Sequence, residues 1–139
     1  MENKVYAVID TNVIVSALIS TKPDSIPLIV LSHVYNGPIV PVYNDEILAE
    51  YREVLKRDKF HLKPEDIEEA LKTIKETGLN LERTPVQGEA LPDPKDVVFY
   101  EVKMSKEDAY LVTGNIKHFP KKPFVVTPRE MIEILNSKK

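Results

Sequence analysis

The sequence predicts an α/β protein of three layers, an α/β/α sandwich in which a central, mostly parallel sheet lies between helices. Two observations indicate this class. Short apolar runs rich in β-branched residues alternate along the chain with longer segments of helical periodicity. Residues that favour helix N-caps follow several of these runs directly, as in a chain that turns from strand to helix.

The first predicted strand, residues 5–9, is a nearly continuous apolar run that ends at Asp10. Such a run is typical of a buried parallel strand with both faces covered. Further strands are expected at residues 39–43, 79–83, 109–113 and 124–126. Helices are expected at residues 11–20, 26–35, 44–57 and 64–77. Pro41 lies within the second predicted strand. Proline in a sheet is found in edge strands or at strand ends, so we expect one of these two positions here.

The segment 97–104 is ambiguous by propensity, because it is β-branched and aromatic. The aspartates before it favour a helix, and we predict a helix there. The segment 79–91 has no clear periodicity and is expected to be irregular after a short strand. Thr127 and Glu130 form a capping box that predicts a last helix to about residue 136.

Length and composition predict one domain over residues 1–139. Hydrophobic residues make up 42% of the chain and charged residues 29%, which argues against disorder. The absence of cysteine excludes disulfides, thiolate metal sites and cysteine nucleophiles. Asp10 interrupts the apolar start, and no other stretch is long enough to cross a membrane, so we expect a cytoplasmic protein.

The net charge is 19 − 22 = −3. Proteins that are held to nucleic acid by charge alone are usually basic. Either this chain does not bind nucleic acid, or metal ions supply the positive charge at its site.

Acidic and amide side chains converge on one predicted edge of the sheet. Asp10 and Asn115 each follow a buried strand, and parallel strands share one carboxyl edge, where open α/β sheets bind ligands. Asp96 caps a helix that enters from that edge, and Glu50 lies near the apolar stripe of the helix 44–57. Such acids repel one another unless a cation lies among them, and oxygen-only ligands suit Mg²⁺ or Mn²⁺. The alternatives are that Asp10 only caps a helix and that Glu50 is a surface residue.

The histidines, at positions 33, 61 and 118, show no metal-ligand spacing. A structural or solvated role is the ordinary interpretation of each. His118 is a partial exception because it closely follows Asn115.

The chain resembles the PIN domain family of nucleases. The matching motifs are VIDTNV at residues 8–13, DEILAE at 45–50, DPKD at 93–96 and YLVTGN at 110–115. Their order and spacing match along almost the whole chain. The segment IKHFP at 116–120 resembles a subgroup catalogued as toxin components of toxin–antitoxin pairs. The resemblance implies a Rossmann-like parallel sheet and a helix after Asp96.

The resemblance also implies the site residues. Asp10, Glu50 and Asp96 take the acidic metal-binding positions. Asn115 takes the fourth catalytic position, which is often Asp in the family, so a second metal is in doubt. Asn12, Asp93 and Thr113 are expected to support the site. Asp108 precedes its strand, lies at the opposite edge, and is excluded.

The activity implied is that of an endoribonuclease dependent on Mg²⁺ or Mn²⁺, either a toxin component or an RNA-processing enzyme. Lys117 and His118 are expected to contact the RNA backbone with Lys121 and Lys122, unless this segment is an ordinary solvated turn. An antitoxin protein and a second copy of the chain are expected partners. The alternative is a catalytically weak PIN-like module that binds RNA or protein. A phosphatase of the haloacid-dehalogenase type would need an acid where Asn12 stands.

Overall fold

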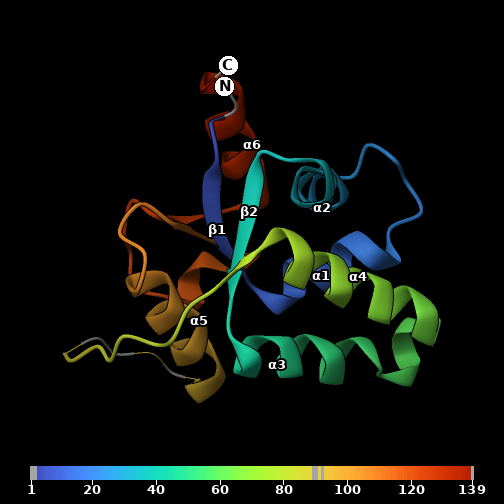
Figure 1. Cartoon of the computed structure of the whole chain (residues 1–139), viewed down its shortest axis with the longest axis horizontal. Helices are drawn as coiled ribbons and strands as arrows, with labels where there is room; N and C mark the ends of the chain where they lie inside the picture. Colours follow the sequence, from blue (N-terminus) through green and yellow to red (C-terminus); the bar gives the residue numbers. More distant parts are fainter. Residues whose placement is uncertain (1–2, 89–90, 92, 139) are drawn as a thin grey trace.

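The computed structural model describes residues 3–88, 91 and 93–138. Within these residues five parallel strands form one sheet in the order β3-β2-β1-β4-β5 (Figure 1). The strands are β1 (Val5–Ile9), β2 (Ile39–Tyr43), β3 (Leu79–Asn80), β4 (Tyr110–Val112) and β5 (Val125–Val126). The predicted α/β class with a parallel sheet is confirmed.

Six α-helices and two short 3₁₀ turns connect the strands in the described part of the chain. The helices are α1 (Thr11–Ile19), α2 (Ile26–Asn36), α3 (Asp45–Leu55), α4 (Pro64–Thr77), α5 (Pro94–Met104) and α6 (Pro128–Ser137). The 3₁₀ turns are η1 (Asp58–Phe60) and η2 (Ile116–His118). The segment 97–104 is helical, as the capping aspartates and the family resemblance indicated, so its β propensity is overridden by tertiary context.

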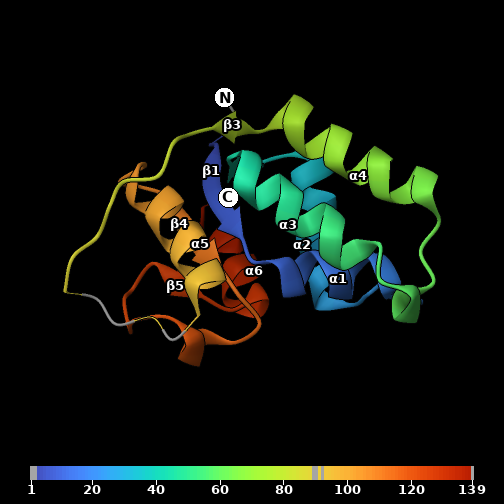
Figure 2. The ribbon, with the colours of Figure 1, turned by 90° about the horizontal axis from the view of Figure 1, so that it is seen from below.

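The sheet lies between two layers of helices. Figure 1 shows α5 on one side of β1 and β2, with α1, α2 and α4 on the other side. The view from below in Figure 2 separates the same two groups. Ala7 and Val8 are adjacent in β1 and therefore point to opposite faces, and both are completely buried. Both faces of the central strand are thus covered, which explains its continuously apolar sequence.

The strand order creates a switch point between β1 and β4. Connections from β1 proceed outward through β2 to β3, and the chain then returns to the other side of β1 to form β4 and β5. Ile9 and Val112, the last residues of β1 and β4, are paired in register. The residues that follow them, Asp10 and Thr113, therefore emerge side by side at the crevice where such sheets bind ligands.

The prediction that Pro41 places β2 at a sheet edge is wrong, because β2 lies between β3 and β1. The strand β3 is only two residues long and pairs with Val42 and Tyr43 alone. The outer side of β2 is thus unpaired at Pro41, where no amide N–H is available to donate. The expected strand at residues 79–83 is correspondingly shorter.

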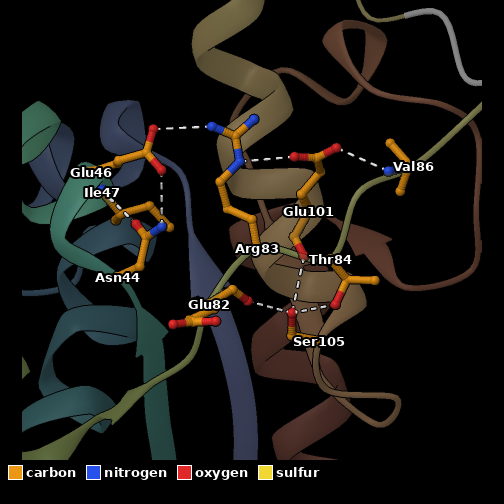
Figure 3. A network of polar contacts seen from close by, with 9 residues as sticks. All are labelled: Asn44, Glu46, Ile47, Glu82, Arg83, Thr84, Val86, Glu101 and Ser105. Carbon is orange, nitrogen blue, oxygen red and sulfur yellow. Dashed lines mark hydrogen bonds and ion pairs between the residues drawn. The ribbon is translucent and has the colours of Figure 1, made fainter.

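Residues 81–88 form an irregular segment that contacts both α3 and α5 (Figure 3). Arg83 forms ion pairs with Glu101 of α5 at 2.8 Å and with Glu46 of α3 at 3.0 Å. Glu101 also accepts a hydrogen bond of 2.9 Å from the amide of Val86. This network joins the two helices that carry Glu50 and Asp96. The irregular segment was predicted to run to residue 91, and its residues 89 and 90 lie outside the described residues.

None of the helices that the structure describes combines the length and the apolar character needed to cross a bilayer.

Candidate metal centre

Asp10 is held at the end of β1 by hydrogen bonds to both oxygens of its carboxyl group. Oδ1 accepts from the amide of Thr11 at 2.8 Å, which makes Asp10 the N-cap of α1. Oδ2 accepts from the hydroxyl of Thr113 at 2.7 Å. Burial raises the pKa of Asp10, and the hydrogen bonds from Thr113 and Thr11 partly offset this shift. The capping interpretation is therefore confirmed, but the side chain also faces the crevice between β1 and β4.

Asn12, in the first turn of α1, contacts both Asp10 and the loop that follows β4. Its Nδ2 donates to Asp10 Oδ2 at 3.3 Å, and its Oδ1 accepts from the amide of Gly114 at 3.1 Å. A Cβ atom added at Gly114 would lie only 3.3 Å from this oxygen, so a side chain there would press on the contact. The structure thus brings Asn12 and Thr113 to Asp10, and their predicted supporting role rests on direct contacts.

Asp96 lies in the first turn of α5 and is buried, with 9% of its surface exposed. Its Oδ2 has no hydrogen-bond partner; among the described residues, Thr11 Oγ1 is the other buried side-chain atom in this condition. Nδ1 of His118 lies 3.8 Å from Oδ2 of Asp96. Burial, followed by the negative charges of Asp10 and Asp93, raises the pKa of Asp96 to about 6.

Asp93 caps the helix that carries Asp96. Its side chain accepts a hydrogen bond of 2.9 Å from the amide of Lys95, and it lies at the N-cap of α5. Pro94 begins the helix at a position where a missing N–H is harmless. Asp93 is exposed, so its connection to the site is through the helix terminus and through its charge.

Glu50 approaches the two aspartates from α3. Its side chain is 19% exposed, as expected for a residue at the margin of the apolar stripe. Its charge contributes to raising the pKa values of both Asp10 and Asp96, so its carboxylate lies close enough to act on both. Oε1 of Glu50 lies 3.7 Å from Nζ of Lys95. Glu50 also lines a cavity of about 300 Å³ between α3 and α5 with Ala49 and Phe99.

Asn115 reaches the cluster indirectly. Its amide N–H donates to the hydroxyl of Thr113 at 3.0 Å, and its side-chain nitrogen lies 2.9 Å from Nε2 of His118. The hydroxyl of Thr113 in turn binds Asp10. The two strand ends therefore converge as predicted, with the Asn115 side chain paired to His118. Lys117 is exposed on η2, and its contact with RNA stays a prediction.

A divalent cation fits the chemistry of these side chains. Among the described residues, no three acidic or histidine side chains are grouped closely enough to hold a metal ion as they stand. Nevertheless, the negative charge of Asp10 contributes to raising the pKa of Asp96, and Oδ2 of Asp96 has no hydrogen-bond donor. An uncompensated buried carboxylate is costly, and an oxygen-binding cation such as Mg²⁺ or Mn²⁺ compensates it.

Two residues of this region were not predicted from the sequence. Tyr51 was assigned only to the apolar stripe of α3, but its hydroxyl donates to the carbonyl of Ile9 at 2.5 Å. This bond fixes the backbone directly before Asp10. A buried tyrosine hydroxyl generally needs a hydrogen-bond partner, and this rule was the sequence signal that could have indicated the bond. Lys95 was seen as part of a motif, and no sequence signal indicated its approach to Glu50.

Comparison with protein families agrees with this geometry. The family model described as PIN domain matches residues 6–117, from the second residue of β1 to η2. No curated protein and no solved structure matches the chain significantly. The matched region covers well over half of the chain and contains Asp10, Glu50, Asp96 and Asn115. The chain belongs to the PIN domain family, whose members are generally nucleases that use divalent metals.

Proposed function

We propose that the protein is an endoribonuclease that depends on Mg²⁺ or Mn²⁺ and hydrolyses phosphodiester bonds. The observation that carries this proposal is the buried Oδ2 of Asp96, which has no hydrogen-bond donor, together with a second buried carboxylate, that of Asp10, whose charge acts on Asp96. Membership of a nuclease family selects phosphodiester hydrolysis among the reactions that such a metal supports.

Asp10, Glu50 and Asp96 would hold the cation. When bound, the metal supplies activation of a water molecule and stabilisation of charge on the scissile phosphate. The protein supplies rigid placement. Thr113 and Asn12 fix the carboxyl group of Asp10, and Tyr51 fixes the backbone before it. These groups orient the ligands in the manner of supporting residues around other metal sites.

The substrate is proposed to be RNA, with its backbone near Lys117 and His118. Both residues lie on η2, and His118 is 3.8 Å from Asp96. The acidic net charge of the chain agrees with a site in which cations mediate between carboxylates and phosphates. A biological role as toxin component or RNA-processing enzyme in the cytoplasm, with an antitoxin or a second copy of the chain as partner, belongs to the same proposal.

A second candidate is a catalytically weak module that binds RNA or a protein partner. The neutral Asn115 favours this candidate, because its side chain is paired with His118 and adds no charge to the cluster. Three carboxylates instead of four would bind a second cation weakly.

Cleavage of a labelled single-stranded RNA in graded Mn²⁺ distinguishes the two candidates. The proposed enzyme cleaves with Mn²⁺, does not cleave in chelator, and loses activity in Glu50→Gln and Asp96→Asn. Glu53→Gln, one turn further along α3 and exposed, and Asp108→Asn, at the opposite sheet edge, are the matched controls and retain activity. Activity that survives chelation, or that both pairs of variants lose equally, would contradict the proposal.

A further inference from the structure

A small cavity lies beside the candidate metal centre and has no role in the proposed catalysis. It has a volume of about 200 Å³ and begins at η2. Ile116, Phe119, Pro120 and Val125 give it apolar walls. Ligand pockets for drug-sized molecules measure roughly 300–1,000 Å³, so this cavity has room for a single ring or side chain.

The residue at its mouth is unusually exposed for its type. Ile116 is 46% exposed, and it belongs to a small set of large apolar side chains with this property among the described residues. Phe119 is 6% exposed and lines the cavity from the protein interior. The cavity thus offers an apolar surface that is open to solvent and supported by the core.

Its surroundings are basic. Lys117, Lys121 and Lys122 line the cavity, and no Asp or Glu occurs from residue 114 to residue 127. The cavity between α3 and α5 is lined instead by three glutamates, Glu46, Glu50 and Glu53, together with Lys95. A polyanion is therefore attracted more strongly to the cavity at η2 than to the cavity at α3.

We propose that this cavity, the η2 slot, binds one nucleobase of single-stranded RNA next to the scissile phosphate. A nucleotide combines a flat, largely apolar ring with flanking phosphates. The slot offers the complementary features. Phe119 and Pro120 supply apolar surface, and Lys117 and Lys121, which flank them in the sequence, supply positive charge. His118 lies in the chain between the lining residues Lys117 and Phe119, and its two ring nitrogens lie 2.9 Å from Asn115 and 3.8 Å from Asp96.

This inference rests on the proposed ribonuclease function and adds a specific consequence. Binding to phosphates alone is independent of the bases, whereas a slot for a base makes one position of the RNA matter. The enzyme would then require an unpaired base at a fixed distance from the cleaved bond, and double-stranded RNA would be excluded.

The test uses the full chain in chelator, so that binding is measured without cleavage. Fluorescence anisotropy follows a labelled single-stranded RNA of about ten nucleotides, and a series of the same RNA with one base removed at successive positions. We expect one abasic position to weaken binding about fivefold, and Ile116→Ala to weaken binding of the intact RNA by a similar factor. The two losses should not multiply, because each removes the same contact. Lys117→Ala should weaken binding equally for every RNA and reduce its salt dependence.

Ile19→Ala is the matched control, because Ile19 is 44% exposed and lies at the far end of α1. It should leave binding unchanged. Equal affinity for all abasic RNAs, or losses that multiply in Ile116→Ala, would overturn the slot. Preferential, Ile116-dependent binding of an acidic peptide with a leucine side chain would also overturn it and assign the cavity to a protein partner. The abasic series on the unmodified protein needs no variant to fold.

A parallel cleavage assay in Mn²⁺ separates this inference from the proposed function. Cleavage with no dependence on any base overturns the slot alone. Base-dependent binding without cleavage supports the slot and contradicts the ribonuclease.

Discussion

The hydroxyl of Thr113 donates a hydrogen bond of 2.7 Å to Oδ2 of Asp10, joining residues 103 positions apart in the sequence. Thr113 is completely buried, and its oxygen also accepts from the amide of Asn115. One side chain therefore couples the ends of β1 and β4 at the switch point of the sheet. It holds the Asp10 carboxylate in place and favours its ionised form.

Thr113→Val should preserve shape while removing this donor. We expect the activity, or the affinity for Mn²⁺, to fall about 10–100-fold, as for other residues that orient metal ligands. The variant should also lose about 1–3 kcal/mol of stability at neutral pH, because a buried carboxylate loses its partner. Thr113→Ser keeps the hydroxyl and should retain most activity. Titration with Mn²⁺ and thermal unfolding measure both effects, and identical behaviour of the two variants would contradict the role of the hydroxyl.

Asp10→Asn should abolish cleavage without unfolding the protein. We expect activity to fall at least about 10³-fold, which corresponds to roughly 4 kcal/mol of transition-state stabilisation. Burial raises the pKa of Asp10, so a neutral isostere removes an unfavourable charge in the metal-free protein. Asparagine also remains a good N-cap for α1. The melting temperature in chelator should stay unchanged or rise; a much lower value with retained activity would show that Asp10 is only a cap.

The raised pKa of Asp96, about 6, gives the metal-free protein a defined dependence on pH. The folded state binds this proton more tightly than the unfolded state, whose aspartate titrates near 3.8. The resulting stabilisation is complete below about pH 3.8 and is lost as the pH rises through about 6. In chelator the protein should therefore be more stable at about pH 5 than at about pH 7.5, by roughly 1 kcal/mol from this group.

Asp96→Asn should remove most of that difference. Denaturant unfolding of both proteins at the two pH values measures it, and an unaltered pH dependence in the variant would show that other groups are responsible. Mn²⁺ must displace the proton from Asp96. The affinity of the unmodified protein for Mn²⁺ should therefore decrease as the pH is lowered below about 6.

The fold was largely predictable from the sequence because its signals are local. The run before Asp10, the stripe around Tyr51 and the capping box at Thr127 each determine an element through nearby residues. The position of β2 in the sheet was predicted wrongly from Pro41. The missing N–H of Pro41 indicates an unpaired position, but it does not show that β3 pairs with β2 from the next residue, Val42. That information depends on a pairing between distant segments.

The sequence predicted that the ends of β1 and β4 converge, but it did not predict how the side chains there pair. Parallel topology brings the ends of β1 and β4 together, so Asp10 and Asn115 were expected to be neighbours. The register of Ile9 with Val112 instead brings Thr113 to Asp10, and Asn115 is connected to Asp10 through Thr113. The pairing of Asn115 with His118, and of Lys95 with Glu50, depends on side-chain rotamers and loop paths. Neither property has a sequence pattern of its own.

Asn115→Asp should strengthen metal binding. The change adds a charge at the end of β4 with almost no change in shape, and the site would then carry four carboxylates. We expect tighter binding of Mn²⁺ and a lower metal concentration for half-maximal cleavage, with a slightly less stable metal-free protein. The side-chain nitrogen of Asn115 lies 2.9 Å from Nε2 of His118, so the new carboxylate must turn away from His118 to bind the metal. Calorimetric titration beside a cleavage assay measures this, and unchanged midpoints would place Asn115 outside the site.

The most direct test of the metal centre is a crystal soaked in Mn²⁺ and measured at a wavelength where manganese scatters anomalously. The account predicts an anomalous peak between the carboxyl groups of Asp10, Glu50 and Asp96, within coordination distance of their oxygens. It also predicts that Glu50 leaves Lys95, 3.7 Å away in the present structure, to reach the ion. A soak at a Mn²⁺ concentration that supports cleavage, with no peak among these three side chains, would contradict the central claim.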